Sequence, residues 1–418
     1  MPRERTWDNP TGRKGPGGYR IAYYINGHGL GHAVRSGQII RRLVRNPDIR
    51  TIIAVSDLEP HVLLECLCAG MKDEHLRKMQ FRTATFDAGF VQKDSVTIDM
   101  EASLARATEQ LKGWEDMILR EGRWIRMWGF HMVLSDSAAL PLEAASYAGI
   151  PGFAVGNFTW DWIYEPLAMT NTSWLFLTDM CRNGYSKAVG WFQLAFHPDV
   201  KRPPFKHVFP VGLVAEEGRD RRFEIARATG ASPGKPWVLL SFASLDWDSA
   251  ARLKAAGDRS VEYFAIRPLV WPGRMPGNFR MLKQAQFPFA DMVASCDAVV
   301  SKPGYGILSS CAANRKPLVW AERNDFREAA VLEKAIEKHL CGVKITAKEL
   351  YSGDIGPAIQ KALAMPWRPK EPLVADGVER ICNLIWELLE VPEDWTEDSD
   401  WEPVDADWGD EDGDDGGD

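Results

Sequence analysis

The chain has 418 residues, of which 45% are hydrophobic and 26% are charged. This is the composition of a folded globular protein, and it excludes disorder over most of the length. At roughly 100 to 200 residues per domain, the length predicts two domains, each with its own core, and excludes a single small binding module.

The chain carries no sequence signal for a membrane or for secretion. No stretch approaches the roughly 18 to 20 apolar residues of a membrane span, and residues 1–18 lack the apolar core of a signal peptide. The seven cysteines show no repeated CxxC spacing, so we expect buried thiols and neither a disulfide framework nor a zinc site. These features predict a cytoplasmic protein.

The net charge of −8 is unevenly distributed. Residues 393–418 hold 14 acidic residues and no Lys or Arg, which leaves 50 basic against 44 acidic residues, or +6, in the rest. A mildly basic body suits an anionic small ligand such as a nucleotide, and nucleic-acid binding is not expected. We expect the acidic tail to be disordered. Its tryptophans, Trp395, Trp401 and Trp408, leave docking to a protein partner as an alternative.

The first half of the chain alternates between strand and helix signals after a flexible arm over residues 1–18. A β-forming run at 19–25 precedes a glycine cluster and a helical pattern, and the alternation then continues. The expected elements are a helix over 33–46, strands over 51–57, 131–137 and 151–157, and a helix over 140–148. This order is typical of a parallel sheet.

A similar series starts again in the second half. Strand patterns at 235–245, 261–269, 296–306 and 316–325 alternate with helical ones, and a last helix covers 377–390. The Pro-rich segment 202–212 indicates the linker. We therefore predict an α/β protein with the domains 19–205 and 206–372, a C-terminal helical segment 373–390 and the tail 391–418.

The first candidate site is the glycine-rich turn Gly27–Arg35 between strand and helix. Glycines let the backbone approach a ligand closely, and a helix N-terminus favours an anion. The turn lacks the GK[ST] ending of a P-loop and only partly matches a dinucleotide fingerprint, although Asp57 ends the next strand where a ribose-binding acid would stand. His28 and His32 are catalytic candidates, with metal binding as a weaker alternative because no third ligand is near.

The second candidate site is the similar turn Ser301–Ser310. Its glycines and backbone amides suit a pyrophosphate, although a plain turn with a capped helix is an equal alternative. The candidate ligand-binding residues here are Lys302, Gly304, Tyr305, Gly306, Ser309 and Ser310. The segment Ser241–Leu245, with Ser241, Ala243 and Ser244, ends a strand at the sheet edge where such folds bind ligands.

Two further polar clusters interrupt apolar runs. Asp136 ends one strand, and the segment 156–166 contains Asn157, Trp160 and Asp161. An aromatic ring beside carboxylate and amide groups suits a sugar, and ordinary aromatic core with helix caps is the alternative. The segment 322–330, with Glu322, Asp325 and Glu328, follows another strand and suits either the same cleft or the start of a helix.

Taken together and in this order, these motifs resemble the N-terminal glycosyltransferase-like region of plant L-arabinokinases, within the GT-B superfamily. The matching stretches are YYINGHGLGHAVR, FDAGFVQKDSVTID, SDSAALPLEAASYAGIPGFAVGNFTWDWIY and SKPGYGILSS with KPLVWAERNDFRE. The resemblance covers about residues 19–365 and implies two facing Rossmann-like domains, an N-terminal one for the acceptor and a C-terminal one for the nucleotide-sugar. No kinase segment matches, so sugar kinase activity is not implied.

The resemblance also implies roles for single residues. His32 would be the base that deprotonates an acceptor hydroxyl, Asp136 would orient it, and His28 is the reserve candidate. Gly29 and Gly31, with the aromatic cluster, would bind the acceptor. The second glycine turn would hold the diphosphate, without a metal or an organic cofactor. The family commonly has Glu where this chain has Ser310, which bears on nucleotide affinity, and Glu322, Asp325 or Glu328 would supply donor-contacting acids.

The leading hypothesis is therefore a metal-independent, inverting glycosyltransferase that uses a nucleoside-diphosphate sugar, with UDP-sugars favoured. A nucleotide-sugar epimerase or hydrolase on the same fold is one alternative, since fold does not determine reaction. A non-catalytic nucleotide-sugar-binding scaffold is another. Dinucleotide-dependent oxidoreduction is the weakest of these readings.

Overall fold

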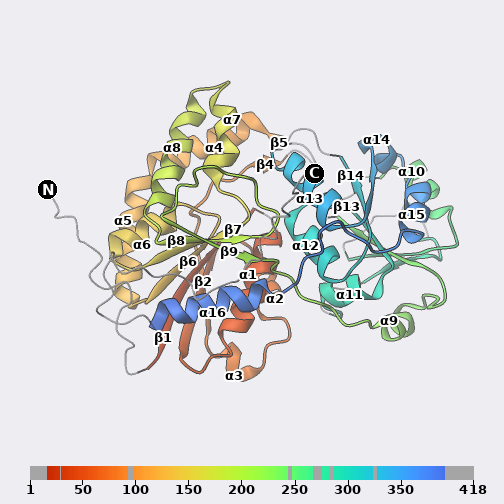
Figure 1. Cartoon of the computed structure of the whole chain (residues 1–418), viewed down its shortest axis with the longest axis horizontal. Helices are drawn as coiled ribbons and strands as arrows, with labels where there is room; N and C mark the ends of the chain where they lie inside the picture. The colour runs from red at the N-terminus through yellow and green to blue at the C-terminus, as the bar shows by residue number, and fades with distance from the viewer. Residues whose placement is uncertain are drawn as a thin grey trace, which may run out of the picture.

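A computed structural model describes residues 17–28, 30–92, 98–242, 247–266, 275–282, 286–322 and 327–390. Two parallel sheets, one in each half of the chain, lie side by side with helices around them (Figure 1). The acidic tail 391–418 and residues 1–16 of the predicted arm lie outside the described residues. Within the described ranges, no helix has the length and apolar character needed to cross a membrane.

The first sheet has seven strands in the part of the chain that the structure describes. In their order across the sheet they are β3 (Met79–Thr83), β2 (Ile49–Ser56), β1 (Tyr19–Ile25), β6 (Met132–Asp136), β7 (Gly152–Gly156), β8 (Gly190–Leu194) and β9 (His207–Gly212). All neighbouring pairs are parallel. The order reverses between β1 and β6, which makes this the point where an open α/β sheet forms a ligand crevice.

Helices cover both faces of the first sheet. One face carries α1 (Leu30–Leu43), α2 (Pro60–Cys68) and α16 (Gly377–Glu390), and the other carries α4 (Met100–Lys112), α5 (Trp114–Trp128), α6 (Leu140–Ala148), α7 (Trp160–Ala168) and α8 (Ser173–Ser186). Alternate side chains of β1 enter the two cores, as the pleat requires: Ala22 and Tyr24 pack on one face, Ile21 and Tyr23 on the other. A short helix, α3 (Asp73–Leu76), and the antiparallel pair β4 (Val91–Gln92) and β5 (Ile98–Asp99) complete this half.

The second sheet has six described strands, again all parallel. Their order is β12 (Phe279–Met281), β11 (Glu262–Ala265), β10 (Trp237–Ser241), β13 (Ala298–Ser301), β14 (Leu318–Ala321) and β15 (Gly342–Ile345). Its reversal lies between β10 and β13, the two strands followed by the predicted donor-binding turns.

Helices also cover both faces of the second sheet. One face carries α9 (Arg222–Thr229), α11 (Phe289–Ser295), α12 (Tyr305–Ala313) and α13 (Glu328–His339), and the other carries α10 (Ser249–Ala256), α14 (Ala347–Tyr351) and α15 (Gly356–Leu363). The predicted α/β architecture with two parallel sheets is therefore confirmed.

The first sheet extends beyond the boundary that the sequence suggested. The division was placed between residues 205 and 206, but β9 follows it and pairs with β8 along Gly190–Leu194. The prolines that indicated a linker at 202–212 stand before this edge strand and within it, at a position where a missing N–H is tolerated. We therefore place the change of sheet after Gly212.

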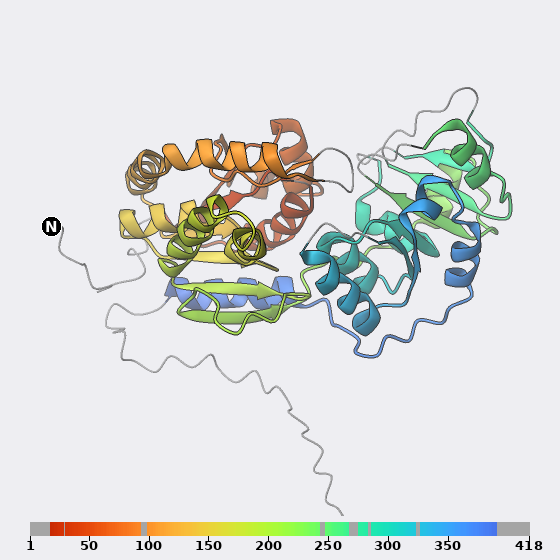
Figure 2. The same cartoon turned by 90° about the horizontal axis from the view of Figure 1, so that it is seen from above.

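The C-terminal helix returns from the second half to the first. Figure 2 shows α16 beside the strands of the first sheet. Its apolar stripe, Ile381, Cys382, Ile385 and Leu389, is at most 2% exposed and joins the core formed with α1 and β9. Arg42 near the end of α1 forms two hydrogen bonds with Glu379, at 2.7 and 2.5 Å. The last helix is thus part of the core of the first half.

Removing side-chain volume from this helix should destabilise the first half. We expect Ile385→Ala, at a side chain that is 0% exposed, to lower the free energy of unfolding by about 2 to 5 kcal/mol, because it removes buried methyl groups and leaves a cavity. Urea unfolding followed by circular dichroism measures this change. Glu387→Ala on the exposed face is the matched control, expected within about 0.5 kcal/mol of wild type. Equal effects of both substitutions would contradict the packing described here.

Candidate active site

The candidate site lies at the carboxyl ends of β1 and β6. These strands are neighbours in the sheet, yet the helices that follow them, α1 and α6, cover opposite faces. In open α/β sheets this is the place where ligands bind, between the two connections. Both the turn after β1 and the residue that ends β6 had been predicted as site residues.

The turn between β1 and α1 depends on a glycine. A Cβ atom at Gly27 would stand 1.9 Å from Oδ1 of Asp57, so no larger residue fits here without movement. The side chain of Asn26 accepts a hydrogen bond from the backbone N–H of His28 at 2.8 Å and shapes the turn. Asp57, the candidate ribose-binding acid, thus packs against the turn. Gly29 lies outside the described residues.

His32 and Asp136 form the central pair of the site. The His32 Nδ1 atom lies 2.7 Å from Oδ1 of Asp136, and the side chains are 14% and 0% exposed. A carboxylate can only accept, so this contact requires the proton on Nδ1. The tautomer leaves the lone pair on Nε2, the atom that a general base needs. The sequence had placed both residues in the site, although they are 104 positions apart.

Asp136 is held as a buried carboxylate. Burial acts to raise its pKa, but the adjacent charge of Arg35, the contact with His32 and the hydrogen bonds from both hold the pKa well below its usual range. Ser36 Oγ donates to Oδ2 at 2.9 Å, and Ser137 Oγ donates to Oδ1 at 3.2 Å. The carboxylate therefore stays charged at every pH at which the protein is expected to work.

Arg35 is the last residue of the predicted glycine-rich turn, but the sequence analysis gave it no role of its own. Its Nε and Nη2 atoms donate to the two oxygens of Asp136 at 2.8 and 2.5 Å, and its Nη1 atom donates to Oδ1 of Asn157 at 2.5 Å. Asn157 in turn donates to the carbonyl of Ala195 after β8, at 2.5 Å. A sequence signal existed, because Arg35 lies three residues after His32 and therefore on the same side of α1.

A second acid stands near the other histidine. The His28 Nε2 atom is 3.4 Å from the carbonyl oxygen of Asp87, and the Asn26 side chain donates to the Asp87 carboxylate. Burial raises the pKa of Asp87, while the neighbouring His28 lowers it. Gly89 has a positive φ of 55°, and a Cβ there would overlap the His28 ring. Asp87 was not a predicted site residue, although it lies in one of the stretches that carry the family resemblance.

The aromatic cluster packs inside the first half. The Trp160 side chain is 5% exposed, stacks on Tyr164 with ring centroids 5.4 Å apart, and meets Phe90 and Phe158 edge to face. Asp161 is buried near Arg182, with Oδ2 and Nε 3.3 Å apart, and burial raises its pKa. A sugar cannot stack on Trp160 in this conformation. The packing supports the core interpretation for these two residues, whereas Asn157 does face the site.

Across the crevice stands the N-terminus of α12 in the second half. A Cβ at Gly306 would lie 3.8 Å from the Cα of Gly31, so the first turns of α1 and α12 approach closely. Tyr305 stacks on Phe158 with ring centroids 5.7 Å apart. A cavity of ≈ 20 Å³, which is room for about one water, lies between the helices. Its lining includes Gly31, Arg35, Asn157, Tyr305, Gly306, Ser309 and Ser310.

The other residues predicted to bind the nucleotide-sugar lie at the carboxyl ends of strands in the second sheet. The Ser241 carbonyl accepts a hydrogen bond from Ser301 Oγ at 2.6 Å, which joins β10 and β13. Glu322 follows β14 with its Oε2 atom 4.0 Å from Nζ of Lys344, and Glu328 is the first residue of α13. Lys302 and Gly304 lie between β13 and α12. Ala243, Ser244 and Asp325 lie outside the described residues.

An arginine of the second half contacts the first half directly. Arg327 donates to the Glu165 carboxylate at 3.1 Å and to the backbone carbonyl of Trp162. Its guanidinium carbon also lies 4.4 Å from the centroid of the Trp162 ring. This contact lies beside the crevice and joins α7 to the start of α13.

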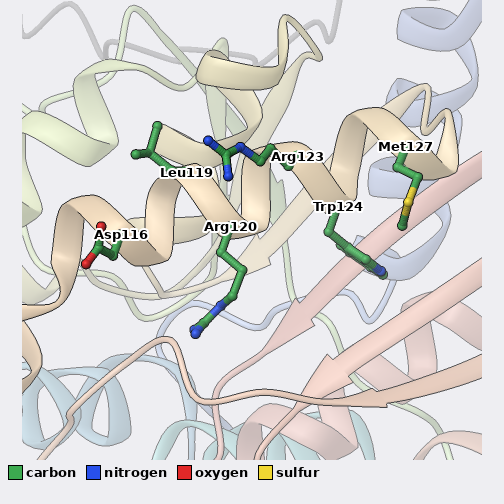
Figure 3. A pocket seen from close by; sticks show the side chains of 6 residues that line it. All are labelled: Asp116, Leu119, Arg120, Arg123, Trp124 and Met127. Carbon is green, nitrogen blue, oxygen red and sulfur yellow. The ribbon is translucent and has the colours of Figure 1, made fainter.

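A larger cavity, of ≈ 420 Å³, lies away from this edge on the outer side of α5 (Figure 3). Its lining residues are Asp116, Leu119, Arg120, Arg123, Trp124 and Met127, all from one face of the helix. It contains none of the predicted site residues and does not lie at the carboxyl ends of the strands. The size of a cavity therefore does not identify the candidate site here. Among the described residues, no three His, Cys, Asp or Glu side chains gather as metal ligands.

The fold can now be assigned to a class. Two Rossmann-like halves, each with a parallel sheet, give the chain the GT-B fold, and solved glycosyltransferases with this fold are similar to it along most of the chain. The glycosyltransferase of kitacinnamycin is 14% identical with a TM-score of 0.59, covering 90% of this chain and all (100%) of that one. UGT89C1 of Arabidopsis thaliana, solved with quercetin, is 11% identical with a TM-score of 0.57, covering 89% and 95%.

The similarity in sequence is to a particular plant protein. L-arabinokinase of Arabidopsis thaliana is 27% identical over 355 residues, which are 82% of this chain and 32% of the plant protein. The chain thus spans about a third of the length of that relative. No family model matches the chain. The resemblance inferred from the glycine turns and the SDSAALPLEAASYAG stretch is confirmed, and with it the fold that it implied.

The buried pair of Arg35 and Asp136 should make stability depend on acid. Because the folded-state pKa of Asp136 lies below its unfolded value of about 3.9, the pair stabilises the protein above that pH, and this contribution is lost as the pH falls through the folded value. In Asp136→Asn the stability should depend less on pH below about 5, and at pH 7 the loss should be about 3 to 5 kcal/mol, since Arg35 is left buried and unpaired.

Urea titrations of wild type and variant between pH 7 and pH 3 measure this difference. Asp179→Asn, at an exposed position of α8, is the control and should follow the wild-type curve within about 0.5 kcal/mol. An unchanged acid dependence in Asp136→Asn would contradict the assigned charge of the pair.

Proposed function

We propose that this protein is a glycosyltransferase that moves a sugar from a nucleoside-diphosphate sugar to an acceptor hydroxyl. The observation that carries the proposal is the His32 and Asp136 pair at the switch point of the first sheet, facing the N-terminus of α12 at the switch point of the second. A base on one side of a crevice and an anion-binding helix end on the other are what direct sugar transfer needs.

The proposed catalytic base, His32, lies in the first half. With Nδ1–H held by Asp136, the Nε2 atom of His32 accepts the proton of the acceptor hydroxyl as its oxygen attacks the anomeric carbon. The carboxylate then stabilises the imidazolium that forms. One bond to the acceptor oxygen forms while the bond to the diphosphate oxygen breaks. A single displacement of this kind inverts the configuration of the sugar, and inversion is part of the proposal.

The groups that would bind the leaving diphosphate lie in the second half. The first backbone N–H groups of a helix have no partner within it and carry partial positive charge, so the start of α12 suits the diphosphate. Lys302, just before this helix, adds a positive side chain. We propose that these groups stabilise the departing diphosphate without a metal ion.

The similar solved proteins support this proposal at the level of fold. VinC, a glycosyltransferase solved in complex with DTDP, is 12% identical with a TM-score of 0.53 and covers 88% of this chain. UDP-sugars are the donors we propose to test first, with dTDP-sugars next. The kinase activity named for the plant relative is not part of the proposal, because the chain covers about a third of that protein.

Donor binding can be tested before any acceptor is known. A thermal-shift series with UDP, dTDP, GDP and ADP, each with a sugar conjugate, and with NAD, should show stabilisation by one nucleotide family. A ligand at 100 times its dissociation constant adds about 2.7 kcal/mol, or a shift of a few degrees. The shift should persist in EDTA. Stabilisation by NAD alone would contradict the proposal and favour an oxidoreductase.

The base can be tested once a donor and an acceptor are found. His32→Ala should lower kcat by about 10² to 10⁴, the usual contribution of a general base, with the donor-induced thermal shift retained. His61→Ala, at an exposed position of α2, is the matched control and should keep wild-type turnover. Turnover of His32→Ala within tenfold of wild type would contradict the role. Release of free sugar without any acceptor would instead identify the protein as a hydrolase.

A further inference from the structure

The guanidinium of Arg35 connects three segments of the first half: α1, the end of β6 and the end of β7. It contacts both oxygens of Asp136, the last residue of β6, the side chain of Asn157 after β7, and Ser137 Oγ at 3.0 Å. Arg35 itself comes from α1 and is 8% exposed. A buried arginine with hydrogen bonds to each of these groups holds them in one geometry, because its planar fork cannot adapt to others.

This arginine changes the electrostatics of the histidine and carboxylate pair. In a pair without a cation, the full charge of the carboxylate acts on the imidazole and favours its protonation. Here Arg35 Nη2 lies 2.5 Å from the same oxygen, Oδ1, that His32 contacts, and 2.9 Å from His32 Nδ1. The carboxylate keeps its hydrogen bond to the ring, but most of its charge is compensated at close range.

The positions of these atoms also decide the tautomer. Arg35 can only donate, and so its contact with His32 Nδ1 would be a hydrogen bond only if that nitrogen carried no proton. Nδ1 is closer to the Asp136 oxygen, at 2.7 Å, than to Arg35, at 2.9 Å, and the carboxylate cannot supply a proton. The Nη2 atom has its own acceptors in Asp136 and Ser137. The proton therefore belongs on Nδ1.

We propose that Arg35 is a positioning residue: it fixes the Asp136 carboxylate and compensates its charge, so that His32 is held neutral, with Nδ1–H toward Asp136 and a free lone pair on Nε2. The use of that lone pair as a catalytic base rests on the proposed function. The tautomer and the charge of the ring do not, and they can be measured without a substrate.

The pKa of His32 depends on its burial and on the charged groups around the ring. Asp136 from β6 and Arg35 from α1 are adjacent, His28 lies in the turn before α1, and Asp87 lies after β3. Burial lowers the pKa of His32, Asp136 raises it, and Arg35 and His28 lower it again, with a net shift below 6.5. A ring of this kind is neutral at pH 7 and can accept a proton there.

The test is a histidine NMR titration of the full chain labelled with 15N in its imidazole rings. The His32 signals are assigned by their loss in His32→Gln. In wild type we expect the Nδ1–H tautomer and a titration midpoint below 6.5. In Arg35→Met the uncompensated carboxylate should raise the midpoint by about one unit or more. Arg35→Lys keeps the charge without the planar fork, so its midpoint should stay near wild type while the ratio of tautomers changes.

Arg35→Met alone leaves a buried unpaired carboxylate and can fail to fold. The double variant Arg35→Met with Asp136→Asn avoids this, since it removes both buried charges together. In this variant the midpoint should fall below that of Arg35→Met, and the Nδ1–H tautomer should lose its dominance. The proposal is overturned if wild-type His32 is an Nε2–H tautomer or is protonated at pH 7. A midpoint in Arg35→Met within about 0.2 units of wild type overturns it as well.

Once a sugar donor and an acceptor have been found, the same variants distinguish the positioning role of Arg35 from the proposed transferase function. In Arg35→Met the acidic limb of the kcat profile should move to higher pH in step with the NMR midpoint, with KM for the donor changed less than twofold. In Arg35→Lys the acidic limb of the kcat profile should lie close to its position in the wild type. If no transfer is found with any sugar nucleotide, the proposed function fails while the NMR result still decides the role of Arg35.

Discussion

The geometry of the candidate site depends on the buried ion pair of Arg35 and Asp136. Two charges removed from water are costly unless the geometry is good and the remaining polar atoms are satisfied. Here both carboxylate oxygens accept from the guanidinium, Ser36 adds a further donor, and Asn157 takes up the remaining Nη1. The pair thereby connects α1 to the ends of β6 and β7. Because the His32 ring contacts the same carboxylate, the pair also orients the candidate base.

The same strand order in both halves explains why the candidate site lies between them. Each sheet reverses its order once, between β1 and β6 and between β10 and β13; α1 follows β1 at the first of these points, and α12 follows β13 at the second. The first turns of α1 and α12 lie close together at Gly31 and Gly306, and Tyr305 reaches across to Phe158. The chain thus brings a histidine from one half to a helix N-terminus from the other. The Arg327 contact with Glu165 and Trp162 joins the halves beside this point.

The sequence predicted the parts of the structure that short-range patterns encode. Strand and helix periodicity located β1, β6, α6, β13 and α16, and the two predicted glycine turns lie where α1 and α12 approach each other. His32 and Asp136 were found because the family resemblance gave each a role. No role was assigned to Arg35 or Asp87, because the burial of a charged residue depends on partners about 100 positions away for Arg35 and about 60 for Asp87.

For the same reason Trp160 was a candidate sugar-binding residue: a tryptophan beside carboxylates has the same local pattern in a core as in a cleft. The prolines before and within β9 likewise look like a linker until the pairing with β8 is known.

The structure also bears on the position where this chain departs from its family resemblance. A glutamate there would reach a nucleotide ribose with a carboxylate, whereas Ser310 has a short side chain whose hydroxyl donates to the carbonyl of Gly306 at 2.9 Å, within its own helix. A serine engaged in this way offers the ligand an acceptor lone pair at most. Two of the predicted acids, Glu322 after β14 and Glu328 at the start of α13, lie on the strand edge next to β13. If the proposed donor site is correct, recognition of the nucleoside must shift from α12 toward these residues, and the chain then discriminates between nucleotides by a different set of contacts on the same helix-end scaffold.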